Sequence, residues 1–146
     1  EEPMIIHRMY DKAGRKARVR ELLDLVDLGE KLLDRYPHQI SGGEAQRIMI
    51  ARALSLDPKI LILDEPTSML DVSVQAQVMT LLKELQEKLG LSYLFISHDL
   101  DVVRWFCDEI AVMEEGKFVE TGRTEDVIGH PKMEFTKKLV ENFILE

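Results

Sequence analysis

Apolar residues in the first part of the chain recur at the spacing of helices, without a run typical of a strand. The apolar positions of residues 15–28 fall on one helical face. Ser41 and Glu44 form an S-x-x-E pair, the capping-box pattern that starts a helix, and this helix is expected to end near the turn that contains Pro58. We therefore predict a helical subdomain over residues 1–57.

The pattern then changes to short apolar runs. The unbroken run Ile60–Leu63 predicts a strand that is buried on both faces, as in a parallel sheet. A long amphipathic helix is predicted from its cap Asp71 to Gly90, followed by a second buried strand over residues 92–97. Strands that alternate with helices favour an α/β fold with parallel strands.

The remainder of the chain predicts a hairpin and a helical tail. A third strand, EIAVM, leads through the turn Glu115-Gly116 into KFVETG. From Thr124 onward the apolar residues lie on one side of a helix. The strand-containing core is therefore predicted over residues 58–123, and the helical tail over residues 124–146.

Composition and charge narrow the function. The 146 residues carry a net charge of −8, which argues against nucleic acid as a partner. The single cysteine, Cys107, rules out a disulfide framework, and the four histidines are too far apart to suggest a zinc site. No run approaches the roughly 20 apolar residues of a membrane span, so direct membrane insertion is not expected.

Polar residues follow two of the predicted strands, where ligands bind in open α/β sheets. Asp64 and Glu65 follow the first strand, and His98 follows the second. Asp64 could hold Mg²⁺ through water, while Glu65 could orient or deprotonate an attacking water. His98 could contact a terminal phosphate. Taken alone, Asp-Glu before proline is more often a solvated turn, and a histidine after a strand is more often structural.

Gly42 and Gly43 open the helix that Ser41 caps. Adjacent glycines at a helix N-terminus let the backbone approach a phosphate, although paired glycines also mark many turns. The order and spacing of all these features together are much more specific than any one of them.

The complete series resembles the ATP-binding subunit of an ABC transporter. ISGGE (40–44) resembles the signature motif, ILILDEP (60–66) the Walker B strand, SMLD (68–71) the D-loop and His98 the switch histidine. Further segments narrow the resemblance to the oligopeptide and dipeptide importers: DVSVQAQV (71–78), SYLFISHDLDVV (92–103) and AVMEEGKFVETG (111–122).

This resemblance implies a fold, a reaction and partners. The fold would be part of an ABC nucleotide-binding domain of the P-loop NTPase class, with residues 58–123 as the C-terminal part of its RecA-like core. ATP hydrolysis would be coupled to the import of oligopeptides or dipeptides. The implied partners are a second ATP-binding subunit, as a homodimer or heterodimer, and transmembrane permease subunits. The chain itself would be cytoplasmic and peripheral on the inner face of the cell membrane.

The resemblance also implies a role for each candidate residue. Glu65 and His98 would be catalytic, and Asp64 would hold Mg²⁺. The signature residues would bind the ATP of the partner subunit; they are Ser41, Gly42, Gly43 and Glu44. The D-loop residues Ser68 and Asp71 would lie beside this ATP.

The chain also departs from the family pattern. It contains no G-x-x-x-x-G-K-[ST] motif, the P-loop that holds the triphosphate, and no Q-loop. We therefore expect the isolated chain to be inactive and to be the C-terminal portion of a longer subunit, as its start without methionine suggests. Glu44 replaces the more usual glutamine of the signature, and Met69 the more usual alanine of the D-loop.

Two alternatives stay open. The C-terminal lobe of an SMC-like chromosome or DNA-repair ATPase carries similar motifs, but a heptad coiled coil should lead into it, and residues 1–36 show none. A truncated, non-enzymatic fragment that folds and self-associates is the second alternative. The transported solute is not specified by these residues.

Overall fold

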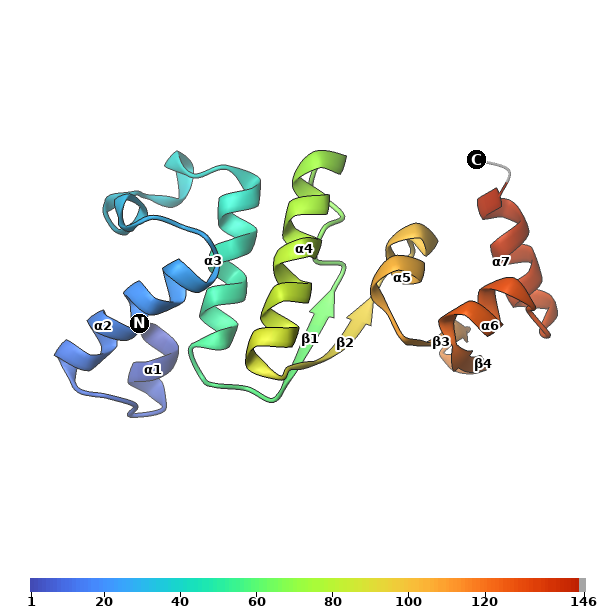
Figure 1. The fold of residues 1–146 in the computed structure, drawn as a ribbon, viewed down its shortest axis with the longest axis horizontal. Coiled ribbons are helices and arrows are strands. Elements are labelled where there is room, and N and C mark those ends of the chain that lie inside the picture. Colours follow the sequence, from blue (N-terminus) through green and yellow to red (C-terminus); the bar gives the residue numbers. More distant parts are fainter. Residues whose placement is uncertain (145–146) are drawn as a thin grey trace. The chain divides into compact units, whose positions relative to one another are not determined.

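The computed structural model describes residues 1–144 and divides the chain into two compact units, which meet in the sequence between Leu94 and Phe95. Three α-helices and two 3₁₀ helices precede the first strand of the first unit. Figure 1 shows their arrangement. Its elements are α1 (Glu2–Ile6), α2 (Lys12–Leu25), the 3₁₀ helices η1 (Glu30–Asp34) and η2 (Pro37–Gln39), α3 (Gly42–Leu54), β1 (Ile60–Asp64) and α4 (Val72–Leu89).

Side-chain caps begin the three longest of these helices. Asp11 accepts a hydrogen bond from the amide of Gly14 at 2.7 Å, so α2 begins earlier than the apolar pattern predicts. Ser41 caps α3 and Asp71 caps α4, as predicted. Gly90 ends α4 in the left-handed conformation, with φ of 65°, which glycine adopts without steric cost.

The core of the first unit consists of the apolar faces of its helices. Its most completely buried side chains are Met4, Val26, Val78, Leu82 and Leu85. Three of these lie on α4, which carries a continuous apolar stripe. No strand precedes Ile60 within the part of the chain that the structure describes, as the sequence predicts. The three-part division at residues 57 and 123 stays a prediction.

β1 pairs with β2 (Ser92–Ile96), and the two strands run in the same direction (Figure 1). The predicted α/β class with parallel strands is therefore confirmed. Ser92 donates its amide hydrogen to the carbonyl of Lys59 at 3.0 Å, which sets the start of the pairing.

The prediction that the first strand is buried on both faces is wrong, and the second strand, predicted to be buried, has Leu94 54% exposed. Leu61 and Leu63 are 7% and 8% exposed, whereas Ile60 and Ile62 are 65% and 68% exposed. The covered face lies toward α4, because the hydroxyl of Tyr93 in β2 donates to the carbonyl of Leu82 at 2.8 Å. Burial there raises the pKa of Tyr93 to about 12.

The second unit contains the predicted hairpin and, as far as residue 144, the predicted helical tail; the last two residues of that prediction, 145–146, lie outside the described residues. Its elements are α5 (Leu100–Phe106), β3 (Glu109–Glu114), β4 (Lys117–Arg123), α6 (Thr124–Gly129) and α7 (Glu134–Ile144). β3 and β4 pair antiparallel around the turn Glu115-Gly116, whose φ angles are 46° and 78°. Two consecutive positive φ angles are typical of a two-residue hairpin turn, so this prediction is confirmed.

The carboxylate of Glu120 holds the start of α7. It accepts hydrogen bonds from the amides of Lys132 at 3.0 Å and Met133 at 3.1 Å. Hydrogen bonding lowers the pKa of Glu120; the amide of Lys132 is the largest cause, and the amide of Met133 also contributes. The tail is therefore tied to β4 by a charge-assisted contact.

Candidate functional site

β1 brings Asp64 and Glu65 to its carboxyl end, as predicted. Both residues are exposed, and they precede the buried pair Pro66 and Thr67. Glu65 has a φ angle of 44°, in the left-handed region that favours glycine. A glutamate in this conformation is held there by its surroundings, and such strained residues cluster at functional sites.

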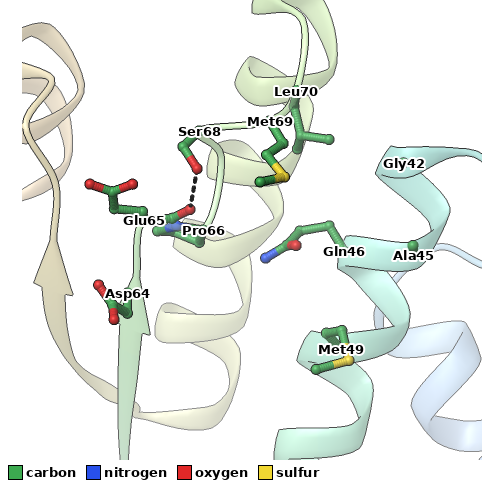
Figure 2. Close-up of a pocket in the computed structure, with 10 residues that line it drawn as sticks. All are labelled: Gly42, Ala45, Gln46, Met49, Asp64, Glu65, Pro66, Ser68, Met69 and Leu70. Atoms are coloured by element: carbon green, nitrogen blue, oxygen red, sulfur yellow. Dashed lines mark hydrogen bonds between the residues drawn. The ribbon is translucent and has the colours of Figure 1, made fainter.

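Ser68 provides part of that restraint. Its amide and its hydroxyl both donate to the carbonyl of Glu65, at 3.3 Å and 3.2 Å (Figure 2). The chain then turns again, because the amide of Leu70 donates to the carbonyl of Thr67 at 3.1 Å. The segment from Glu65 to Leu70 is therefore a series of closed turns, which leads directly to Asp71.

The carboxylate of Asp71 serves as the N-cap of α4. Its Oδ1 atom accepts the amide hydrogen of Val74 at 3.0 Å. Ser68 and Asp71, predicted as D-loop residues that lie beside ATP, thus have contacts within their own chain that fix the backbone on either side of Met69.

Ser41 and Glu44 form the predicted capping box at the start of α3. The hydroxyl of Ser41 accepts the amide hydrogen of Glu44 at 3.3 Å, and the Glu44 carboxylate accepts the amide hydrogen of Ser41 at 2.7 Å. The Ser41 amide and then its hydroxyl, which donates at 2.9 Å, lower the pKa of Glu44. The first turn of α3 therefore already binds a carboxylate of its own chain, that of Glu44.

The two glycines of the signature segment lie against α4 and the turn before it. A Cβ atom built on Gly42 would be 3.4 Å from Cδ2 of Leu70, an ordinary contact. A Cβ atom built on Gly43 would be 2.6 Å from Cγ1 of Val74. The structure thus brings the signature segment next to the residues that follow Asp64 and Glu65.

A pocket of about 640 Å³ lies between α3 and the turns after β1. Its lining residues are Gly42, Ala45, Gln46, Met49, Asp64, Glu65, Pro66, Ser68, Met69 and Leu70. Four predicted site residues are among them: Gly42, Asp64, Glu65 and Ser68.

Sequence reasoning missed the part of this pocket that α3 provides. Ala45, Gln46 and Met49 follow Gly42 at spacings of three, four and seven residues, so they form one face of the helix. Figure 2 shows Gln46 reaching from α3 toward Pro66. The same helical spacing, read forward from Gly42, would have found these residues.

The side chains of the pocket do not all point to one place. In Figure 2 the carboxylates of Asp64 and Glu65 point away from α3, whereas Gln46 and Gly42 lie on the opposite side of the turn. Within the first unit the two carboxylates therefore point away from the helix whose N-terminus carries the signature segment.

Arg47 is a further residue that the sequence did not indicate. Its Nη1 atom donates to the carbonyl of Val26 at 3.0 Å and lies 3.3 Å from Oδ2 of Asp27. Asp27 has a φ angle of 54°, so Arg47 holds the tight turn that ends α2. This contact fixes α3, and with it the signature segment, to the preceding helix.

The predicted roles of His98 and of a metal site are not tested by the structure. His98 is exposed and belongs to the second unit, so its role as a switch stays a prediction. Among residues 1–144, no group of three or more His, Cys, Asp or Glu side chains is arranged to hold a metal ion. Asp64 can supply carboxylate oxygens of the kind that Mg²⁺ prefers, but other ligands would have to complete the coordination.

Comparison with known proteins identifies close relatives. Residues 3–68 match the family described as ABC transporter. The chain is 51% identical over 140 residues to the oligopeptide transport ATP-binding protein OppF of Streptococcus mutans, covering 95% of this chain and 46% of the relative. It is 49% identical over 140 residues to the dipeptide transport ATP-binding protein DppF of Haemophilus influenzae, covering 96% and 43%. The chain thus spans less than half the length of these relatives.

The fold has a matching solved structure. The cbiO1 protein of Clostridium perfringens, described as part of the ABC transporter complex cbiONQ, superposes with a TM-score of 0.76 at 32% identity. The match covers 97% of this chain and 54% of the other. None of the helices in residues 1–144 has the length and apolar character needed to span a bilayer.

Proposed function

Because residues 3–68 match the ABC transporter family and most of the chain is similar to the ATP-binding proteins of oligopeptide and dipeptide transporters, we propose that it is part of the ATPase subunit of a peptide importer. The observation that carries this proposal is the geometry of the first unit. There a capped glycine turn and a pair of strand-end carboxylates lie on the two sides of one pocket.

We assign the hydrolytic step to Glu65 and metal binding to Asp64. Glu65 orients or deprotonates the attacking water, and its left-handed backbone, pinned by Ser68, fixes where the carboxylate is presented. Asp64 would hold Mg²⁺ through water, and a metal bound there would supply positive charge to offset the charge of the phosphates. The adjacent positions of the two carboxylates support this division of roles.

The signature segment serves a nucleotide held by a partner ATP-binding subunit. Ser41, Gly42 and Gly43 lie at the N-terminus of a helix of 13 residues, where backbone amides and the helix dipole favour an anion. Glu44 holds this turn in shape through the capping box. The Asp64 and Glu65 carboxylates point away from α3, which supports one nucleotide for these carboxylates and another for the signature segment (Figure 2).

The remaining roles follow from the same proposal. His98 contacts the terminal phosphate and reports its presence, while Ser68 and Asp71 shape the D-loop beside the partner. The complete assembly contains a second ATP-binding subunit and transmembrane permease subunits, and it works at the cytoplasmic face of the membrane with ATP and Mg²⁺. The 146 residues alone, which contain no G-x-x-x-x-G-K-[ST] motif, are expected to bind Mg-ATP weakly.

The substitution Glu65→Gln in the assembled transporter tests this assignment. We expect ATP turnover to fall by roughly 10²- to 10⁴-fold, because an amide cannot accept the proton of the attacking water. ATP binding should persist, and retained ATP should hold the two ATP-binding subunits together on a sizing column.

Glu115→Gln is the matched control, because Glu115 is also exposed and has a φ angle of 46°, but lies in the hairpin turn of the second unit. It should leave turnover unchanged. Near-normal hydrolysis by Glu65→Gln would remove Glu65 from the role of base.

A further inference from the structure

We propose that Val74 is a positioning residue, which fixes the signature turn against the start of α4 by filling the space where Gly43 has no side chain. The inference rests on the proposed function, since it concerns the same site. In that proposal Gly43 offers its backbone to a phosphate. We infer that the packing of α3 against α4 also requires a residue without a side chain at position 43.

The geometry leaves no room for a methyl group at position 43. A Cβ atom there would lie 2.6 Å from Cγ1 of Val74, nearer than real Cβ atoms come to other heavy atoms. Val74 is β-branched and lies in the first turn of α4, where one χ1 rotamer is strongly preferred, so Cγ1 cannot turn away at low cost. A side chain at position 43 must therefore push α3 away from α4.

Val74 connects the two turns because both its backbone and its side chain are engaged. Its amide donates to Asp71 at 3.0 Å, which closes the D-loop segment, and its side chain contacts the signature glycine. Any displacement of Val74 therefore moves either the cap of α4 or the start of α3. Gly42 and Leu70, which precede Gly43 and Asp71 in the sequence, both line the pocket.

The contact at Gly43 differs from that at Gly42. A Cβ atom on Gly42 would meet only Cδ2 of Leu70, at 3.4 Å, and the end of a leucine side chain can move. Gly43 and Val74 thus form the tight pair, and the distance between the signature turn and the D-loop is set by their combined size.

A rescue experiment in the assembled transporter tests the inference. Gly43→Ala should lower ATP turnover by roughly 10- to 100-fold through misplacement of the signature turn, while the KM for ATP changes little. Val74→Ala in the same chain should recover most of that turnover, because it removes the atom that the new methyl group meets. Gly129→Ala is the control, since Gly129 lies in α6 with open space around it, and it should have no effect.

The outcomes separate packing from direct contact with nucleotide. If the double variant is as slow as Gly43→Ala, the added methyl group acts on the nucleotide, and the inference is wrong. It is also wrong if Gly43→Ala hydrolyses ATP as fast as Gly129→Ala. If Gly43→Ala fails to fold and Val74→Ala restores folding, the contact is supported.

Failure of the proposed function would look different. If the unmodified transporter hydrolyses no ATP, the function is wrong, and thermal unfolding of the chain then decides the packing. Gly43→Ala should lower the unfolding midpoint by roughly 3–6 °C, and Val74→Ala should restore it. Equal midpoints for Gly43→Ala and Gly129→Ala would overturn the inference.

Discussion

Replacement of Glu65 by asparagine should stabilise the fold while it removes the proposed base. Glu65 has a φ angle of 44°, and the left-handed conformation costs a residue other than glycine about 1–2 kcal/mol. Asparagine tolerates this conformation better than glutamate, because its short side chain can hydrogen-bond to the local backbone. The Glu65 side chain is exposed, so a shorter side chain leaves no buried cavity.

We therefore expect Glu65→Asn to raise the free energy of unfolding by about 0.5–1 kcal/mol, which for a chain of this size is a shift of roughly 2–5 °C in the unfolding midpoint. Urea titration followed by circular dichroism measures the first quantity, and a thermal scan the second. ATP turnover of the assembled transporter should be lost in the same variant.

Glu115→Asn provides the matched comparison. Glu115 has a φ angle of 46° and precedes Gly116, so this substitution creates the Asn-Gly sequence that two-residue hairpin turns favour. It should stabilise the chain to a similar extent and leave turnover intact. If Glu115→Asn stabilises the chain but Glu65→Asn destabilises it, the backbone at position 65 is not strained, and the argument for a functionally imposed conformation fails.

Two further predictions concern contacts outside the pocket. Arg47→Met should lower the free energy of unfolding by about 1–3 kcal/mol, because the half-buried carbonyl of Val26 loses a charged donor. The control Arg20→Met, which breaks the exposed pair with Glu30, should lower it by less than about 1 kcal/mol. Equal losses of the two variants in urea titrations would contradict the role of Arg47. The lowered pKa of Glu120 means that its stabilising effect is complete above the ordinary glutamate pKa of about 4.3 and is lost as the pH falls through the lower folded-state value. Thermal unfolding midpoints should therefore differ between the unmodified chain and Glu120→Gln at pH 7 and converge at pH 2–3, and a difference that persists at low pH would refute the charge-based explanation.

Features set by neighbouring residues could be predicted from the sequence. The caps Ser41 and Asp71 act on amides three residues ahead, so their sequence spacing already contains the interaction. The turn at Glu115 and Gly116 is equally local. The sites of Asp64 and Glu65 followed from a strand that ends in polar residues, and the strand itself was signalled by its apolar run.

Features that depend on packing between distant segments could not be predicted. Arg47 contacts a carbonyl 21 residues away, and nothing in the surrounding sequence distinguishes it from a surface arginine. An apolar run such as Ile60–Leu63 does not indicate whether one or both faces of the strand are covered. The exposure of Ile60 and Ile62 is therefore known only from the structure. The need for glycine at position 43 likewise depends on Val74, which belongs to another helix.

The carboxylate that Glu44 places at the start of α3 has a consequence for how an anion would enter this turn. Because Ser41 and Glu44 satisfy each other's backbone amides, the turn is ordered before any nucleotide is present. No ordering entropy is then lost when a phosphate arrives, but the phosphate meets a helix dipole that a negative charge already neutralises in part. In the proposed role, a phosphate would therefore bind beside the Glu44 carboxylate on a preformed backbone, and repulsion between the two negative charges would limit how tightly the phosphate is held.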